Sequence, residues 1–145
     1  MKLVSLVFGL ALMVSGSAAY GQQPSFPQEI DPKTTQAYSM LIERQVKVQA
    51  QLETLLREYS SAWPPAKKLQ AELDALKIEM KKMSELNQIL IPKLTSGVGA
   101  LILRKTVLTS EIKRLLEEES SEWPPLKEKQ RELELLEEQI QKILS

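Results

Sequence analysis

The sequence predicts an all-α protein: two tandem helical hairpins that pack as an up-down-up-down four-helix bundle with coiled-coil-like seams. Three observations lead to this fold class. Apolar residues recur every three or four positions through four long segments, which is the spacing of an amphipathic helix. No stretch alternates with the period of two that a β-strand needs. One segment occurs twice, 60 residues apart, which is typical of a repeated structural unit.

Composition narrows the classes of function. The chain of 145 residues carries 19 Lys plus Arg and 19 Asp plus Glu, so its formal net charge is zero. Proteins that bind nucleic acid usually show a basic excess. The chain has no Cys and no His, which removes disulfides, thiol catalysis, the commonest general base and the commonest zinc ligands. We therefore expect no nucleic-acid partner and a fold held by packing alone.

Residues 1–21 have the pattern of a secretory signal peptide. Lys2 precedes an apolar run of 12 residues, and small residues follow it. The run is shorter than the roughly 20 residues that span a bilayer, so cleavage is favoured over an uncleaved membrane anchor. Cleavage fits after either Ala19 or Gly21. The mature protein is then expected in the periplasm or outside the cell.

Residues 22–31 contain Pro24 and Pro27 and show no periodicity, which predicts an extended N-terminal leader. Asp31 and Pro32 then suit the start of a helix, with Asp at the N-cap and Pro at the first helical position. The first helical hairpin is expected over 32–91, with its turn at 60–65.

The repeat aligns 40–85 with 100–145 without a gap, and 17 of 46 positions are identical. Its most specific element is a Ser-Ser-x-Trp-Pro-Pro string, which stands at 60–65 and again at 120–125. Leu and Glu matches arise easily between helices, but two such strings in one register do not. The sequence therefore indicates duplication of one hairpin, with the second copy over 100–145 and its turn at 120–125.

Steps of three and four residues define an apolar seam on each of the four arms, 38–62, 66–90, 98–122 and 126–143. Polar residues interrupt the seams, among them Gln45, Lys105 and Lys129. Seam polar groups set the register of helix pairing, and a Lys near an end extends its amine to water. These roles are favoured over a catalytic lysine.

The breaks between the arms contain the prolines. Trp63 and Trp123 precede Pro and should be extended, and the second Pro of each pair suits the first helical position. Residues 92–99 form the linker, and the third helix is expected to start near Thr95 or Ser96. Two alternatives remain open: a helix that kinks at Pro92 and continues, and a dimer of open hairpins.

The acidic residues that begin with the run at 117–119 raise the question of a metal site. Calcium loops need Asp or Asn with a Gly turn, and di-iron bundles need Glu-x-x-His pairs; neither pattern occurs. A solvated helix face is the better interpretation. We expect no metal, no cofactor and no catalytic residues, and hence no enzyme.

The candidate partner-binding residues are Trp63, Trp123, Glu119 and Glu122. A Trp at a hairpin tip either plugs the end of the bundle or docks a partner, and the plug is favoured. Glu119 and Glu122 stand at seam positions of the third arm, where they mark either a polar partner site or a frayed helix end.

The sequence thus predicts an exported, non-enzymatic helical-bundle protein that acts as a protein-interaction or structural module. Its partner is another protein or a second copy of itself. The alternative is a periplasmic holdase-type chaperone with an exposed apolar surface. Membrane contact through the hairpin tips is the less favoured role.

Overall fold

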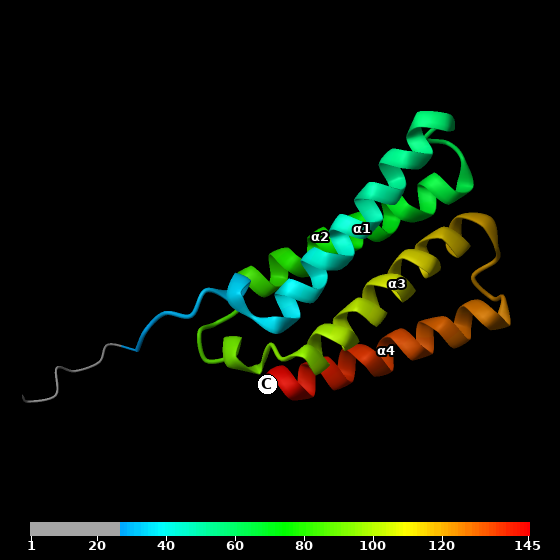
Figure 1. Ribbon diagram of the computed structural model, residues 1–145. Coiled ribbons are helices and arrows are strands. Elements are labelled where there is room, and N and C mark those ends of the chain that lie inside the picture. The colour runs from blue at the N-terminus through cyan, green and yellow to red at the C-terminus, as the bar shows by residue number, and fades with distance from the viewer. Residues whose placement is uncertain (1–26) are drawn as a thin grey trace, which may run out of the picture.

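The computed structural model describes residues 27–145, and all the regular structure in this range is helical (Figure 1). The helices are α1 (Gln36–Glu58), α2 (Pro64–Ser84), α3 (Ser96–Glu118) and α4 (Pro124–Leu144). Two short 3-10 turns, η1 (Pro32–Thr34) and η2 (Ile91–Lys93), precede α1 and α3. The predicted all-α class is confirmed. The predicted signal peptide and the first half of the leader lie outside the described residues.

Threonine caps both long helices that follow a 3-10 turn. The Oγ1 of Thr35 accepts the Tyr38 N–H at 3.3 Å, and the Oγ1 of Thr95 accepts the Val98 N–H at 3.4 Å. The predicted start of the third helix near Thr95 or Ser96 is confirmed. The predicted start at Asp31 and Pro32 was wrong for α1, because these residues begin η1, where the Asp31 carboxylate accepts the Lys33 N–H.

Both Trp-Pro-Pro turns are built alike. Trp63 and Trp123 have extended backbones, with φ/ψ of −64°/132° and −61°/120°, as the steric effect of a following Pro requires. The first Pro of each pair, Pro64 or Pro124, opens the helix. The expectation that the second Pro would hold the first helical position is corrected by one residue. Neither of the first two helical N–H groups has an intrahelical partner, so both positions accept Pro.

The second helix ends earlier than the seam pattern indicated. α2 stops at Ser84, so Asn87 and Leu90 lie outside it. The Asn87 side chain accepts the Ile89 N–H at 3.1 Å, a local bond that competes with helix formation. The Ser84 hydroxyl donates to the Lys81 carbonyl at 2.7 Å in the last turn.

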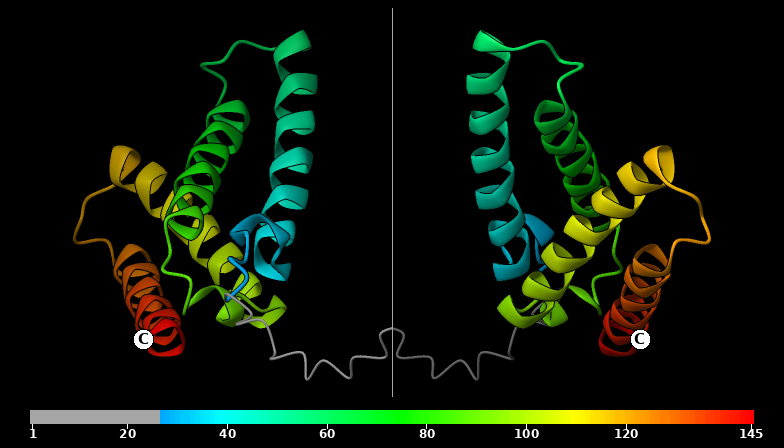
Figure 2. Two further views of the ribbon diagram at one scale, coloured as in Figure 1. Left: turned by 90° about the vertical axis from the view of Figure 1, so that its left-hand side faces the viewer. Right: turned by 90° about the vertical axis from the view of Figure 1, so that its right-hand side faces the viewer.

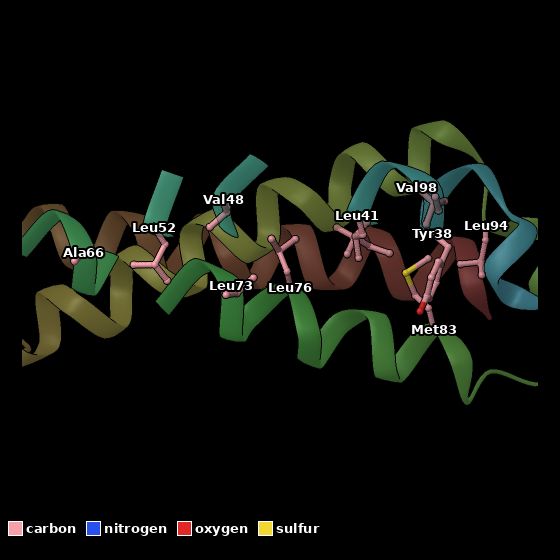
Figure 3. Packing of buried hydrophobic residues seen from close by; sticks show 12 residues of the cluster. Tyr38, Leu41, Val48, Leu52, Ala66, Leu73, Leu76, Met83, Leu94 and Val98 are labelled. Atoms are coloured by element: carbon pink, nitrogen blue, oxygen red, sulfur yellow. The ribbon is translucent and has the colours of Figure 1, made fainter. Parts of the chain in front are cut away.

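The main core lies among α1, α2 and the first half of α3. Figure 3 shows its buried side chains in a row between the helices. Leu41, Val48 and Leu76 have no exposed surface, and Val98 and Ile102 of α3 complete the cluster. The predicted seams supply most of these residues.

α4 lies at the edge of the molecule, with α3 between it and α1 (Figures 1 and 2). α3 packs against all three other helices, and α4 packs mainly against α3. Ile140 and Leu144 of α4 reach the main core, whereas Leu126 joins a separate small cluster with Ile112 and Leu115 of α3. The hairpins therefore share a core near the C-terminus and have separate contacts near their tips.

The two seam lysines form ion pairs between helices. Lys105 of α3 lies 3.0 Å from Glu79 of α2 and 3.5 Å from Glu137 of α4. Lys129 of α4 lies 2.8 Å from Glu111 of α3. Charged seam residues with defined partners fix the register of neighbouring helices.

None of the helices in residues 27–145 is both long enough and apolar enough to cross a membrane.

Candidate functional site

The hairpin tips are the candidate interaction site, and they lie at the same end of the molecule, away from the C-terminus (Figure 1). Each turn repeats the same hydrogen bonds. The Trp63 N–H donates to the Ser60 carbonyl, and the Trp123 N–H donates to the Ser120 carbonyl, both at 3.0 Å. Each Ser Oγ also accepts the N–H two residues on. These bonds hold the two Trp residues in one backbone geometry.

The two Trp side chains have different surroundings. Trp63 stacks on Tyr59, with ring centroids 4.0 Å apart and planes 20° apart, and is packed against the main core. Trp123 is more exposed, and Glu119 occupies the place that corresponds to Tyr59. Trp63 is thus supported by Tyr59 of its own hairpin, while Trp123 is 38% exposed.

Glu119 and Glu122 belong to the turn after α3, not to its seam. α3 ends at Glu118, so the expectation that these two residues continue the seam is corrected. Both are exposed. Glu122 pairs with Lys127 of α4, and Glu119 donates its backbone N–H to the Leu115 carbonyl at 2.8 Å as the helix ends. Both carboxylates flank Trp123 in the sequence and give this tip an acidic character.

A cleft of about 560 Å³ separates the first hairpin near its tip from the second half of α3. Its apolar wall includes Leu52 and Leu56 of α1 and Ala66 of α2. α3 contributes Lys113 and Arg114 to the opposite wall, followed by two glutamates. The cleft thus combines an aliphatic side with a side of mixed charge.

Arg114 is the most unusual polar group in this cleft. Its Nη1 donates to Glu118 Oε2 at 2.7 Å. Its Nε is buried and has no hydrogen-bond partner among residues 27–145. A buried N–H without a partner costs about 1–3 kcal/mol, so an acceptor entering the cleft would gain from meeting it.

Ion pairs hold the second hairpin together behind its tip. Lys129 hydrogen-bonds to Glu111, and this bond lowers the pKa of Glu111 below its ordinary value. Partial burial of the carboxyl opposes the shift, while Lys68 and Arg104 add to it. The net effect keeps Glu111 ionised and stabilises the contact between α3 and α4.

Within residues 27–145, the carboxylates do not form a group of three that could hold a metal ion. Several of the glutamates that suggested this question pair with Lys or Arg. Examples are Glu118 with Arg114, Glu134 with Arg131, and Glu132 with Arg104.

Comparisons of the chain with protein-family models, with curated proteins and with solved structures gave no significant match.

Sequence reasoning missed two polar contacts, one in each hairpin, that join the two helices of that hairpin. Arg44 Nε donates to Glu72 Oε1 at 2.6 Å, and Arg104 Nε donates to Glu132 Oε1 at 2.9 Å. The signal was present, because both residues of each pair are identical between the two copies of the repeat. Identity at polar positions of a weakly conserved helix repeat could have indicated a paired contact.

Proposed function

We propose that this chain is an exported, non-enzymatic protein that binds another protein through its two hairpin tips. The observation that carries the proposal is the gathering of exposed apolar side chains there. Leu56, Tyr59, Leu116 and Trp123 are all large, apolar and exposed, and they lie within a few residues of the two turns. Exposed aromatic groups at a polar rim are typical of protein-binding surfaces.

The proposed architecture has up-down-up-down order and derives from duplication of one hairpin. The bounds of α1 and α3 differ by 60 residues at both ends, and so do those of α2 and α4. The two Arg–Glu pairs and the hydrogen bonds of the two turns recur at the same offset. A duplicated tip offers two related contact points to one partner, which raises the overall affinity when both engage.

Export is the part of the proposal that rests on residues 1–21. Mass spectrometry of the protein recovered outside the cytoplasm tests it. A mature chain that begins at Tyr20 or Gln22 is expected. A soluble exported product that retains residues 1–21 would contradict export by a cleaved signal peptide.

Partner binding is tested by photo-crosslinking in the organism that makes the protein. A photoreactive residue placed at Ser121 samples the second tip, and one at Ser84 samples the opposite end of α2. We expect one discrete crosslinked product from Ser121 that is absent from Ser84. Equal capture from both positions would contradict binding by the tips.

Two Trp variants separate binding from folding. Trp123→Ala should abolish the crosslink from Ser121 and lower the melting temperature less than Trp63→Ala does, because Glu119 stands where Tyr59 stacks on Trp63. Trp63→Ala should lower stability by about 2–3 kcal/mol, because that ring stacks on Tyr59 and packs on the core. Loss of folding in Trp123→Ala would indicate a plug rather than a binding tip.

The second candidate is a holdase-type chaperone, and the cleft with its apolar wall favours it. Such a protein binds many unfolded chains rather than one partner. Suppression of the aggregation of two unrelated denatured proteins, lost on Leu56→Glu, would support the holdase. A single crosslinked partner together with no suppression would support the tip-binding module.

A further inference from the structure

The contact between the two hairpins is asymmetric, because each hairpin contributes a different face to it. α2 packs against α3, but α3 separates α4 from α1 (Figures 1 and 2). Gly99 of α3 fits closely against α1: a Cβ added there would lie 2.8 Å from Ala37 Cα and 2.9 Å from Met40 Sδ. The second hairpin therefore presents one face of α3 to the first, which receives it with a different face.

The same contact with the roles of the hairpins exchanged is absent from residues 27–145. It would place Ser39 of α1 against Gly97 and Ala100 of α3, since each stands 60 residues from its counterpart. All three residues are exposed instead, and a Cβ added at Gly97 would have only Thr95 within 4 Å. A contact without its reciprocal is heterologous, and such contacts propagate head to tail.

Each hairpin therefore has a front face and a back face. The front face is the stripe at 39, 42, 45 and 46 in the first hairpin and at 99, 102, 105 and 106 in the second. The back face is formed by 37, 40, 75, 79 and 83 in the first and by 97, 100, 135, 139 and 143 in the second. Inside the molecule, the second front face meets the first back face where Gly99 approaches Ala37 and Met40 and where Lys105 pairs with Glu79. The first front face and the second back face remain unpaired.

The unpaired front face carries apolar residues whose counterparts are buried. Ile42 is 41% exposed, whereas Ile102 is 2% exposed. Val46 is 62% exposed, whereas Thr106, which has nearly the same shape, is 1% exposed. The exposed front face of α1 therefore has side chains similar in shape to those of the front face that α3 buries.

The unpaired back face shows the same contrast. Leu135 is 43% exposed, whereas Ala75 is 8% exposed. Ile143 is 41% exposed, whereas Met83 is 2% exposed. These four large apolar residues, two on each unpaired face, are otherwise unexplained by the fold.

The ion pair between the two packed faces also has a polar counterpart on the unpaired faces. Inside the molecule, Lys105 on the front face pairs with Glu79 on the back face at 3.0 Å. Their counterparts on the unpaired faces are Gln45 and Gln139. Two amide side chains can donate to and accept from each other, so the chemistry of Gln45 and Gln139 suits an amide pair in the place that the ion pair occupies inside the molecule.

At the positions that correspond to the approach of Gly99 to α1, the sizes of the residues compensate one another. Ser39 is larger than the glycine it corresponds to, and Gly97 and Ala100 are smaller than the alanine and methionine they correspond to. Volume-conserving exchanges are those that packed contacts tolerate best.

We propose that a second copy of this chain docks head to tail on the first, with the unpaired front face on α1 of one copy packed against the unpaired back face on α3 and α4 of the other. The partner is a second copy because each unpaired face resembles a surface whose mate is already present inside the chain. Repetition of the contact gives a short filament or a closed ring. The faces lie along the helices and leave the tips free, so this assembly is independent of tip binding.

Sedimentation of the full mature chain and of two charge variants tests the proposal. The wild type should gain mass as its concentration rises from micromolar to millimolar. Val46→Asp blocks only the front face and Leu135→Asp only the back face, and each should raise the dissociation constant at least about tenfold, equivalent to about 1.4 kcal/mol. Both substituted side chains are exposed, so circular dichroism should show unchanged folding. Ile89→Asp, at an exposed residue outside both faces, is the matched control and should associate like the wild type.

A mixture of the two blocked variants gives the decisive result. Val46→Asp retains a working back face and Leu135→Asp a working front face, so an equimolar mixture should form a heterodimer and grow no further. A wild type that stays monomeric throughout would overturn the proposal. So would a mixture that stays monomeric, or a variant that associates as strongly as the wild type.

Discussion

Glu72 is a charged residue inside the core, and Arg44 is the group that neutralises it. The Glu72 side chain is 5% exposed and lies 2.6 Å from Arg44 Nε. In the corresponding pair of the second hairpin, Arg104 with Glu132, the glutamate side chain is 43% exposed. Removing one partner of a buried pair leaves an uncompensated charge, whereas removing one partner of an exposed pair leaves a hydrated one.

This contrast predicts unequal effects of the same substitution. Arg44→Met should lower the free energy of unfolding by about 2 kcal/mol or more, and Arg104→Met by less than about 1 kcal/mol. Urea denaturation of the two variants at neutral pH measures both values. Equal losses would contradict the difference in burial.

Glu111 predicts a pH dependence at the contact between α3 and α4. Its pKa is lowered in the folded state, chiefly by the hydrogen bond from Lys129. A lowered folded pKa contributes stability above the ordinary pKa of the unfolded chain, and this contribution is lost as the pH falls below about 4.5 through the folded value. Glu111→Gln should therefore be less stable than the wild type at pH 7, with a difference that shrinks under acid conditions.

Glu43→Gln is the control for this pH effect. Lys47 also lowers the pKa of Glu43, but that pair lies in solvent, where water and salt screen it. Denaturation curves of Glu43→Gln should follow the wild type at every pH. A stability difference for Glu111→Gln that does not change with pH would contradict the role of its charge.

At the scale of the elements, seam spacing and Pro placement predicted the four helices and the two short turns. They predicted helix ends less well. Asp31 and Pro32 are good capping residues, but Thr35 competes for the same role and begins α1 four residues later. Asn87 lies on the extrapolated seam, yet its side chain bonds to the backbone and lies beyond the end of the helix. Side chain to backbone bonds of this kind have no periodicity, so a periodic pattern cannot show them.

The approach of α3 to α1 depends on a single glycine. Gly99→Ala should destabilise the fold by about 1–3 kcal/mol, because the added methyl group meets the backbone of Ala37. Gly97→Ala is the matched control in the same helix turn and should be neutral or stabilising by about 0.5 kcal/mol through helix propensity. Thermal unfolding of the two variants compares them. A Gly99→Ala protein as stable as the wild type would mean that the helices are further apart.

The edge position of α4 predicts that matched core residues differ in importance. Leu73 of α2 is buried in the main core, whereas Leu133 of α4 is only partly buried beside the small cluster. Leu73→Ala should cost about 2–5 kcal/mol, and Leu133→Ala about 1–2 kcal/mol. Chemical denaturation gives both values. A larger loss at Leu133 would indicate that α4 is buried by a further contact.

At the scale of the whole molecule, the two hairpins share a core at one end and diverge toward their tips. The sequence indicated two related hairpins but not this divergence. The seams of α1 and α3 look alike in the sequence, but α1 packs against two helices and α3 packs against three. Which face of a helix meets which neighbour depends on contacts between residues far apart in the chain, and a local pattern carries little of that information. The separation of the two tips and the cleft between the first hairpin and α3 both result from the divergence of the hairpins.

Both tips lie at one end of the molecule (Figure 1), and a distance measurement checks this arrangement. Spin labels at Ser61 and Ser121 report the separation of the tips, and labels at Ser61 and Ser84 provide a ruler along α2, whose 21 residues extend about 32 Å at about 1.5 Å per residue. We expect the distance between the labels at Ser61 and Ser121 to be no longer than the distance between the labels at Ser61 and Ser84. A distance of about 60 Å, close to two helix lengths, would show hairpins extended end to end about Pro92 and would contradict it.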